Sequence, residues 1–413
     1  MLSVAYTGIA ATLLLNGRTS HSVFKIPIPT LADSICDIKK NSKQADYLRS
    51  VRVIIWDEAP MVSRTILDCV DHLFRDICDM HRIPFAGKVV VLGGDFRQVL
   101  PVIRRADKAQ LLSETIKQSP LWKHFHNYHL TINQRAGRST EGKEFAKWLL
   151  KVGNGEINLH DQPDSMMIDE ECRLRQARGL IKEIYDIKKL RNPKHVLERT
   201  ILTPYNEEAL RINEEVLKLC PGKAELYYSH DKVISDHPDE AKHFPLEYLH
   251  SLTPAGLPPH EMKLKKGAVV VLLRNITLES KLCNGTRLIV KEMCKNTILC
   301  GLLSDAPARG NALEISDSDV FIPRIPLRPS DSTFPFILER RAFPVRLAYA
   351  MTINKAQGQT FEKVGIDLTR PVFSHGQFYV GVSRVRSKRN VVVQLPNAND
   401  TTTANIVFRE IVQ

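Results

Sequence analysis

Two apolar runs that end in polar side chains constrain the fold of this 413-residue chain more than any other feature. Residues 53–56 lead directly into Asp57 and Glu58, and residues 89–92 lead into the polar turn 93–98. Such runs are typical of strands buried on both faces of a parallel sheet, and open α/β sheets bind ligands at the carboxyl ends of their strands. An Asp there can hold Mg²⁺ and a neighbouring Glu can activate water, although a solvated acidic turn has the same local pattern.

Composition limits the class of protein. The length predicts two or three domains, and a hydrophobic content of 43% supports ordinary globular cores. The net charge of +12 favours a polyanionic partner, nucleic acid above all. Eight cysteines without a Cys-x-x-Cys pair argue against a zinc site or a disulfide framework and suit a reducing compartment. No apolar run approaches the roughly 18 residues that span a bilayer, so we expect no membrane partner.

The first part of the chain, residues 1–135, alternates strand and helix patterns. It contains three strand-like runs, at 2–6, 51–56 and 88–92. Between the second and third runs, residues 63–81 carry apolar side chains at helical spacing. This alternation predicts a first α/β domain with a parallel sheet. Residues 25–50 are irregular and predict a small insertion.

Residues 136–195 are mostly helical and charged and predict a connector, and residues 196–413 predict a second α/β domain that opens with a strand at 200–206. A β-rich insertion is predicted at about 262–340, from short strand-like runs at 268–273, 286–291, 297–303 and 320–322. The chain then returns to α/β patterns, with runs at 345–350, 364–368 and 391–395.

Three further segments place polar residues after predicted strands. Residues 130–135 form a short strand pattern that ends in Arg135, and residues 350–360 are polar and contain glycine. Residues 378–387 place Arg384 in an apolar helical pattern. A buried arginine needs a partner, and either a triphosphate from a facing domain or a structural carboxylate satisfies that need. The amide of Gln98 can sense a terminal phosphate or hold an attacking water, or it can simply end a glycine turn.

In their order along the chain, these segments resemble the Pif-type DNA helicases of the RecD-like branch of superfamily 1. The resemblance runs from Thr7 to Leu395. The stretches that carry it are residues 7–11, GRTSHSVFKIP at 17–27, WDEAPM at 56–61, GGDFRQVLPV at 93–102, LPPHE at 257–261, LCNGTRLIV at 282–290, FPVRLAYAMTINKAQGQT at 343–360 and VFSHGQFYVGVSRV at 372–385. WDEAPM and GGDFRQVLPV are most similar to the helicase of Helitron-type transposons. The resemblance implies two RecA-like domains, an SH3-like β-rich insertion in the second, and a strand-separating wedge at 25–50.

The same resemblance implies catalytic roles. Asp57 would hold Mg²⁺, Glu58 would activate water, and Gln98 would couple the γ-phosphate to the DNA-binding surface. Transition-state charge would be stabilised by Arg135 and Arg384. ATP would be contacted by Asp95, Gln357 and Gly358.

Roles in DNA binding are also implied. Single-stranded DNA would contact five residues of the first domain and two of the second: Thr7, Gly8, His21, Ser22, Phe24, Thr352 and Lys355. An aromatic ring such as Phe24 can stack on a base without reading sequence. For Phe24 the sequence leaves a second interpretation open, that of an ordinary core residue.

One departure from the family concerns the start of the chain. Family members have a strand, a glycine-rich phosphate loop ending in Gly-Lys-Thr and a helix before the segment that corresponds to residues 7–11. Residues 137–144 have the spacing Gly-x4-Gly-Lys, but Glu144 stands where the loop needs a hydroxyl residue and would repel phosphate. We therefore expect a chain truncated at its N-terminus, with an incomplete ATPase site and an open edge on the first sheet.

The predicted function is an ATP-dependent helicase that moves 5′-to-3′ on single-stranded DNA, with ATP and Mg²⁺ as cofactors. Expected partners are single-stranded DNA, junctions and forks, and the expected state is a monomer in the nucleus, with mitochondria as the alternative location. The process would be DNA repair, recombination, telomere maintenance or Helitron transposition. Two alternatives stay open: a catalytically inactive, single-strand-binding remnant, and a degenerate chain that does not fold stably.

Overall fold

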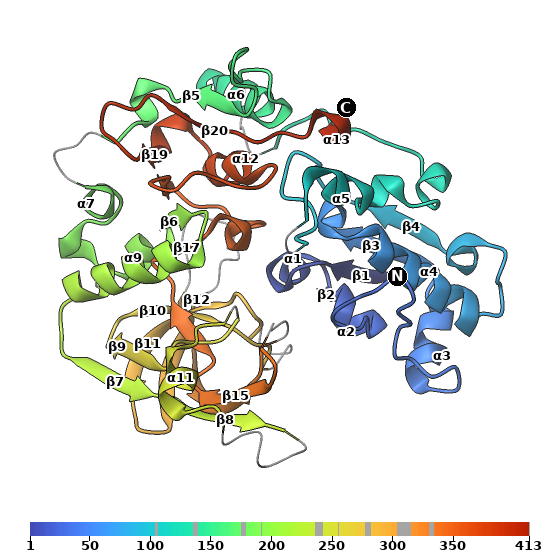
Figure 1. The fold of residues 1–413 in the computed structure, drawn as a ribbon, viewed down its shortest axis with the longest axis horizontal. Helices are drawn as coiled ribbons and strands as arrows, with labels where there is room; N and C mark the ends of the chain where they lie inside the picture. The colour runs from blue at the N-terminus through green and yellow to red at the C-terminus, as the bar shows by residue number, and fades with distance from the viewer. Residues whose placement is uncertain are drawn as a thin grey trace.

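The computed structural model describes ten stretches of the chain: residues 1–103, 106–134, 139–174, 179–190, 192–235, 243–254, 256–276, 282–303, 315–329 and 334–412. Figure 1 shows two α/β lobes side by side, with a β-rich region below the second lobe. The first lobe is blue to teal in that figure, and the second runs from green to red. No helix in the described part of the chain has the length and apolar character needed to cross a membrane.

The first lobe is built on a parallel sheet with strand order β2-β1-β3-β4. Its strands are β1 (Leu2–Ala5), β2 (Arg18–Thr19), β3 (Val53–Asp57) and β4 (Val89–Leu92). Its helices are α1 (Gly8–Leu13), α2 (Ser20–Phe24), α3 (Lys43–Ser50), α4 (Arg64–Ile77) and α5 (Lys108–Ser113). The three strand-like runs and the long helix expected from the sequence are therefore confirmed, and α3 lies inside the predicted 25–50 insertion.

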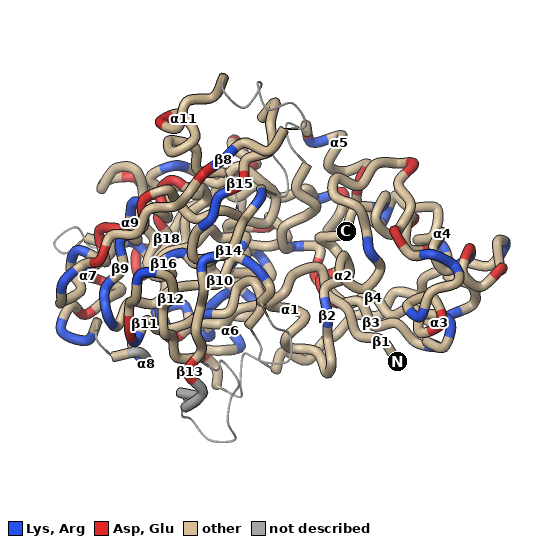
Figure 2. Tube along the Cα trace, turned by 90° about the horizontal axis from the view of Figure 1, so that it is seen from below, with Lys and Arg blue, Asp and Glu red and all other residues tan. Residues whose placement is uncertain are grey.

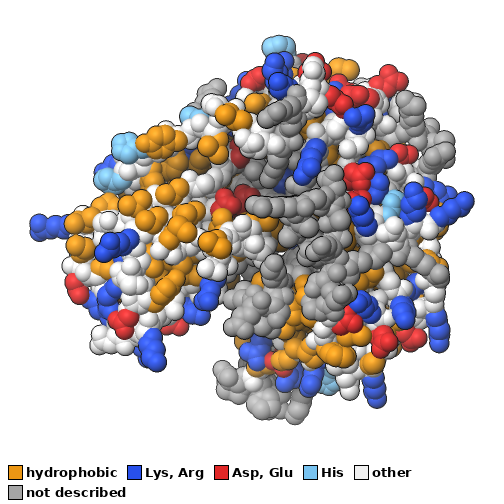
Figure 3. Space-filling view, turned by 180° about the vertical axis from the view of Figure 1, so that it is seen from behind, with side chains coloured by type: hydrophobic (Ala, Val, Ile, Leu, Met, Phe, Trp, Pro, Cys, Tyr) orange, Lys and Arg blue, Asp and Glu red, His pale blue; other side chains and the backbone are white. Residues whose placement is uncertain are grey.

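The expectation that β3 and β4 are buried on both faces was wrong. Ile54 and Trp56 of β3 are each 1% exposed and pack with α2, α3 and α4. The alternate side chains point to the other face, where Val89 and Val91 of β4 are 58% and 49% exposed. Helices thus cover one face of this sheet at β4, and Figure 3 shows many apolar side chains exposed on this lobe, at the left.

The strand predicted at 130–135 is absent from the described residues 130–134, which are irregular. Leu130 and Ile132 are 101% and 77% exposed, so their side chains contribute nothing to a core. A strand needs a paired neighbour to satisfy its backbone groups, and within the described ranges β4 has β3 as its only partner. The predicted open edge of the first sheet is therefore present in this part of the chain.

The open edge leads to a test. Val91→Lys is expected to reduce aggregation on heating and to change stability by less than about 0.5 kcal/mol, because the side chain is half exposed and a charge on an edge strand opposes pairing with other chains. The matched control is Val90→Lys, which places the charge against the core of the same strand and should lower the melting temperature clearly. Light scattering during a thermal ramp measures aggregation, and circular dichroism over the same ramp gives the melting temperature. Equal loss of stability in the two variants would contradict the prediction.

The second lobe contains a parallel sheet with strand order β17-β6-β18-β19. Its strands are β6 (Arg199–Thr203), β17 (Ala350–Thr352), β18 (Lys363–Asp367) and β19 (Val391–Gln394), and its main helices are α6 (Thr140–Asn154), α7 (Leu180–Ile184), α9 (Asn206–Leu219) and α12 (Gln377–Val382). Buried Asn213 joins α9 to this sheet, because its amide binds both the carbonyl and the N–H of Ala350. Phe145 and Val152 of α6 lie in the core of this lobe.

The β-rich region contains a five-stranded antiparallel sheet with order β13-β12-β11-β10-β16. Its strands are β10 (Val269–Leu272), β11 (Arg287–Met293), β12 (Thr297–Leu303), β13 (Ile315–Pro323) and β16 (Val345–Leu347). The run at 345–350, expected to be one α/β strand, is split: β16 belongs to this sheet, and β17 belongs to the parallel sheet. Strands also occur before residue 262, because β7 (Ala224–Tyr228) and β8 (His230–Ile234) pair with later strands.

The remaining elements connect or flank these layers. They are β5 (Ser165–Met167), α8 (Pro193–Leu197), β7 (Ala224–Tyr228), β8 (His230–Ile234), α11 (Leu246–Ser251), β9 (Glu261–Lys265), β14 (Ile325–Leu327), β15 (Ile337–Ala342), β20 (Thr402–Ala404) and α13 (Arg409–Val412). Because the carboxyl ends of both parallel sheets carry the residues predicted to act, the surface between the two lobes is where the site is expected.

Candidate functional site

The turn after β3 holds Asp57 and Glu58 in a constrained geometry. Glu58 adopts a left-handed backbone, with φ 52° and ψ 38°, which costs a non-glycine residue energy and is enriched at functional sites. The Glu58 N–H donates to Oδ1 of Asp57 at 2.9 Å, and the Ala59 N–H donates to the carbonyl of Gly93 at 2.9 Å. A Cβ on Gly93 would lie 3.3 Å from Oδ1 of Asp57, so a glycine leaves room for that carboxylate.

Gln357 brings the second lobe to this turn. Its Nε2 donates to Oε2 of Glu58 at 3.4 Å, and its side chain is 3% exposed. In the described structure, the buried Oε1 atoms of Gln357 and Gln98 have no hydrogen-bond partner. Buried polar atoms are nearly always paired, so these two amide oxygens are available to form a hydrogen bond with a ligand at this site.

Burial is the main influence on the charge of Glu58. It raises the pKa of the Glu58 carboxyl, and the adjacent Asp57 raises it further, whereas Arg384 and Gln357 act in the opposite direction. A carboxylate with a raised pKa is a stronger base than an exposed glutamate, which suits proton abstraction from water. The structure therefore gives Glu58 the electrostatic setting of a general base.

Arg384 lies just beyond α12, in the second lobe, rather than inside the apolar helix that the sequence suggested. Its side chain is 2% exposed, and its Nε donates to the carbonyl of Val380 at 2.9 Å. Nη1 and Nη2 donate to the carbonyl of Gln359 and to Oγ of Ser383. The positive charge of Arg384 lowers the pKa of the Glu58 carboxyl in the first lobe. The other predicted arginine, Arg135, lies outside the described residues.

Asp95 joins the two lobes directly. Its Oδ2 accepts a hydrogen bond from the Tyr379 hydroxyl at 2.8 Å, and its Oδ1 accepts from the Arg97 N–H and from Nη1 of Arg97. The sequence placed Asp95 at the nucleotide, whereas both of its oxygens are held here by donors of the chain. Sequence analysis missed Tyr379, because a tyrosine in an apolar helix pattern gives no sign of a partner that lies 284 positions away.

A second contact between the lobes passes through His375, which is fully buried. Its Nε2 lies 2.8 Å from the carbonyl of Phe96, and its Nδ1 accepts from the Phe408 N–H at 2.9 Å. These partners require a neutral ring with its proton on Nε2. Burial, the largest influence, lowers the pKa of His375 below its ordinary value of 6.5.

This histidine predicts a pH dependence of stability. The unfolded chain binds a proton at His375 near pH 6.5 and the folded chain does not, so stability should fall as pH drops from 6.5 toward the lowered pKa. The loss is about 1.4 kcal/mol for each unit by which the pKa is lowered. His375→Gln should flatten this part of the profile, and chemical denaturation at a series of pH values measures it. Because His21, His195 and His260 also have lowered pKa values, the test is the difference between variant and wild type.

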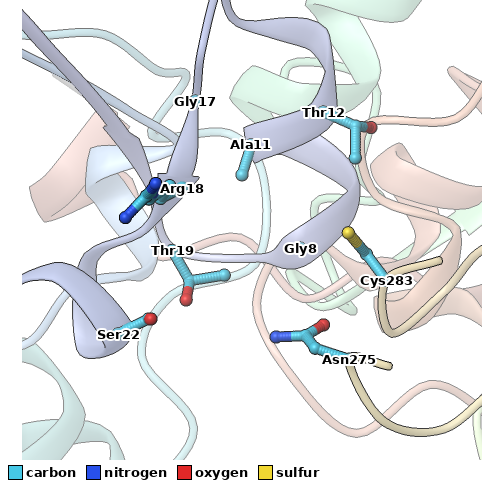
Figure 4. A pocket seen from close by; sticks show the side chains of 9 residues that line it. All are labelled: Gly8, Ala11, Thr12, Gly17, Arg18, Thr19, Ser22, Asn275 and Cys283. Carbon is cyan, nitrogen blue, oxygen red and sulfur yellow. The ribbon is translucent and has the colours of Figure 1, made fainter. Parts of the chain in front are cut away.

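Gly8 and Ser22, two of the predicted DNA contacts, line a pocket between the first lobe and the β-rich region (Figure 4). Arg18 and Thr19 lie on the same wall, and Asn275 and Cys283 come from the opposite side. A Cβ on Gly8 would lie 2.9 Å from the carbonyl of Asn284, so this close approach requires glycine. The predicted contact Thr7 caps α1, because its Oγ1 accepts from the Ala10 N–H at 3.2 Å.

Phe24 is 0% exposed and packs on Trp56 and Phe74. It cannot stack on a base in this structure, so the prediction that it faces DNA is corrected to the core interpretation that the sequence had left open. His21 is half-buried against the ring of Tyr6, and burial lowers its pKa.

The second-lobe residues predicted to contact DNA differ in exposure. Thr352 is 8% exposed, at the end of β17. Lys355 reaches the surface, although protein packed around its ammonium group, with Arg346 as a second influence, lowers its pKa to about 8. Gly358, with φ +80°, faces Ile9 of α1, because a Cβ added at this position would lie 3.7 Å from the Ile9 side chain.

Two other sequence or structural features look like ligand sites but do not offer the groups that such a site needs. In the segment 137–144, Ser139 caps α6 by accepting the Gly142 N–H, and Lys143 and Glu144 continue that helix. Residues 139–144 are therefore a helix start rather than a phosphate loop, and residues 137 and 138 lie outside the described part of the chain. Asp231, His250 and His260 lie close enough together to hold a metal ion, but Asp231 is already neutralised by buried Arg340 at 2.6 Å.

Comparisons with known proteins agree on one family. The model described as PIF1-like helicase matches residues 1–163, and the model described as DNA helicase Pif1, 2B domain, matches residues 247–293. The chain is 26% identical to the ATP-dependent DNA helicase PIF6 of Trypanosoma brucei brucei, over 86% of this chain and 42% of that protein. It is also 26% identical to the human ATP-dependent DNA helicase PIF1, over 95% of this chain and 54% of that protein. The chain thus spans about half the length of the curated relatives it matches.

Solved structures show the same fold. A crystal structure of Bacteroides Pif1 bound to single-stranded DNA matches with a TM-score of 0.69 and 24% identity, covering 100% of this chain and 84% of that one. Pif1 helicase from Candida albicans matches with a TM-score of 0.66 and 23% identity, covering 100% of this chain and 87% of that one. These matches and the two parallel sheets confirm the predicted fold class, an α/β chain with two RecA-like domains.

Proposed function

Because this chain belongs to the Pif1-like helicase family, we propose that it forms the motor of an ATP-dependent DNA helicase, with ATP bound between the lobes and single-stranded DNA bound across them. The observation that carries the proposal is the convergence of Glu58 with Gln357 and Arg384 of the other lobe, beside two orphaned amide oxygens. A site shared by two lobes can convert hydrolysis into their relative movement, because each lobe supplies part of the catalytic set.

The residues divide the chemistry among them. Glu58 accepts a proton from the attacking water, Gln98 and Gln357 orient the water or the terminal phosphate, and Arg384 offsets charge that develops on the phosphate oxygens. Asp57 suits Mg²⁺, because it offers a carboxylate oxygen and, within the described structure, Oδ2 has no protein donor. Bound Mg²⁺ would neutralise phosphate charge. The hydrogen bond from Tyr379 to Asp95 would help to hold the two lobes in a fixed relative position.

Single-stranded DNA would bind on the surface that the two lobes share. The pocket around Gly8, Arg18 and Ser22 and the cationic side chain of Lys355, which reaches the surface, offer backbone N–H, hydroxyl and cationic groups to phosphates. Figure 2 shows Lys and Arg along both lobes, which fits the net charge of +12. Family resemblance supports 5′-to-3′ movement, activity on junctions and forks, and a monomer in the nucleus or in mitochondria. It also supports a role in repair, recombination, telomere maintenance or Helitron transposition.

A second candidate function is single-strand binding without hydrolysis. One observation favours it: residues 1–413 contain no Gly-x4-Gly-Lys-Ser/Thr segment, so the nucleotide needs phosphate-binding groups beyond those seen here. Phosphate release, measured with and without single-stranded DNA, separates the two functions. DNA-stimulated turnover supports the helicase motor. Binding without turnover supports the second candidate, and absence of both contradicts each.

Lys355 provides a quantitative test of the DNA surface. Lys355→Gln is expected to weaken binding to a fluorescent oligothymidylate in low salt and to reduce the slope of log affinity against log salt by about 0.7, the value for one lost contact to a single strand. Lys147→Gln, on the exposed side of α6, is the matched control and should leave the slope unchanged. Fluorescence anisotropy across a salt series measures both slopes, and equal slopes in all three proteins would place DNA elsewhere.

A further inference from the structure

Two of the eight cysteines lie side by side in the core of the first lobe. The Sγ atoms of Cys36 and Cys69 are 3.4 Å apart, and Sγ of Cys36 is also 3.8 Å from the backbone carbonyl of Cys69. Cys36 belongs to the 25–50 insertion, and Cys69 lies in the middle of α4. The two sulfur atoms therefore need to approach by little more than an ångström to form a bond, because a disulfide is about 2 Å long.

Both thiols are 4% exposed, but the cover over them is thin. The neighbours of Cys36 along the chain are at the surface, with Ile35 80% exposed and Asp37 also exposed. Cys69 donates to the carbonyl of Ser34 at 3.2 Å, so the same surface segment covers its sulfur. Opening this segment locally would admit a small oxidant to both sulfur atoms without unfolding the lobe, because such surface segments open at low free-energy cost.

The two thiols differ in acidity. A hydrogen bond from Cys36 is the largest influence on Cys69 and lowers its pKa. That bond, followed by burial, raises the pKa of Cys36. Cys69 is thus the thiol that loses its proton more readily and attacks an oxidant, while Cys36 remains protonated beside it.

We propose that Cys36 and Cys69 are a redox modification site, at which hydrogen peroxide converts the two thiols into an intramolecular disulfide. The Cys69 thiolate attacks one peroxide oxygen, the O–O bond breaks, and a sulfenic acid forms as hydroxide leaves. The Cys36 sulfur then attacks the Cys69 sulfur, the S–O bond breaks, and the released hydroxide takes the Cys36 proton to become water. In total, two thiols lose two electrons and two protons to one peroxide, which yields one disulfide and two waters.

The bond would tie the 25–50 insertion to α4. The covalent loop would contain residues 36–69, which include Asp57 and Glu58. Lys40 already pairs with Asp79 just beyond the end of α4, so the disulfide would reinforce an existing contact between the same elements. This proposal does not depend on ATP or DNA binding, because it rests on the two sulfur atoms alone.

Peptide mapping tests the bond directly. The folded full chain is treated with hydrogen peroxide, alkylated under denaturing conditions and digested with trypsin without reductant. The expected product joins peptide 26–39 to peptide 65–75, each of which contains one cysteine, and it disappears after reduction. Recovery of both peptides as alkylated thiols, or with Cys69 oxidised to a sulfinic acid beside a free Cys36, would overturn the proposal.

Variants separate the pair from general oxidation. In Cys36→Ser, whose hydroxyl can still donate a hydrogen bond to Cys69, the Cys69 sulfenic acid should persist and react with dimedone. Cys294→Ala, which changes an exposed cysteine, should give the linked peptide as in wild type. Oxidation should raise the melting temperature of wild type by roughly 5–10 °C, because the bond restricts the unfolded chain, and should not raise that of Cys36→Ser. An equal rise in both proteins would show that the Cys36–Cys69 bond is not its cause.

Discussion

Glu58→Gln is expected to lower DNA-stimulated ATP turnover by about 10²- to 10⁴-fold while single-stranded DNA binds with unchanged affinity. The substitution removes a proton acceptor and almost nothing else. An amide oxygen can still accept the hydrogen bond from Nε2 of Gln357, which lies 3.4 Å from Oε2 in the wild type. The left-handed backbone of residue 58 and its bond to Asp57 involve main-chain atoms that the substitution leaves in place.

The kinetic pattern identifies the role. A general base acts in the chemical step, so Glu58→Gln should lower kcat and leave KM nearly unchanged. The matched control is Glu144→Gln, which makes the same chemical change on the exposed side of α6 and should have wild-type kinetics. Turnover within about threefold of wild type in Glu58→Gln would show that Glu58 is not the base. The acidic pair would then have the alternative role that its sequence pattern allows, a turn at the end of a strand.

Local sequence pattern predicted the fold wherever an element is determined by its own residues. The runs that became β1, β3 and β4 have the length and apolar character of strands, and the spacing in α4 places one apolar face toward Trp56 and Phe24. The position of Asp57 and Glu58 followed from the rule that ligand groups lie at the carboxyl ends of parallel strands.

The errors in the fold have a common cause, because each concerns what lies beside an element. Val89 and Val91 belong to a run that looks fully buried, yet one of its faces is open. Residues 130–134 have the apolar character of a strand without a described partner to pair with. The run at 345–350 crosses from an antiparallel to a parallel sheet, and neighbouring strands, rather than the run itself, decide where it divides.

Contacts between the lobes were also beyond prediction from residue pattern. Tyr379 and Asp95, like His375 and Phe96, are separated by more than 270 positions, and nothing near either residue indicates its partner. Phe24 shows the reverse problem: base stacking and core packing demand the same aromatic side chain, and only burial distinguishes them.

Arg384→Lys is expected to lower ATP turnover by about 10³-fold or more, with single-stranded DNA binding retained, if Arg384 stabilises charge on the transferred phosphate. Lysine keeps the positive charge but not the planar group that donates to the carbonyls of Val380 and Gln359 at the same time. The charge would then no longer be fixed at one position. Lysine is preferred to alanine, because alanine would leave these buried carbonyls without their donor and would confuse stability with catalysis.

Ser383→Ala is the matched control for this prediction. It removes the hydroxyl that accepts a hydrogen bond from Nη2 and leaves the guanidinium itself in place, so turnover should fall by less than about tenfold. Phosphate release and the melting temperature are measured for both variants. Wild-type turnover in Arg384→Lys, or a loss of turnover that follows a loss of folding, would show that Arg384 has only a structural role, at the end of α12.

The position of Arg384 fits the catalytic outcome. Its Nε and Nη1 donate to the carbonyls of Val380 and Gln359, and its Nη2 donates to Oγ of Ser383, so contacts within its own lobe fix the direction of the guanidinium. Its charge also acts on Glu58 of the facing lobe, where it lowers the pKa of the carboxyl. A guanidinium that is held in place before the nucleotide binds needs no reorganisation during the reaction, and such preorganised charge accounts for the largest single contribution in many enzymes. The expected effect is therefore larger than the loss of any one of its hydrogen bonds would produce.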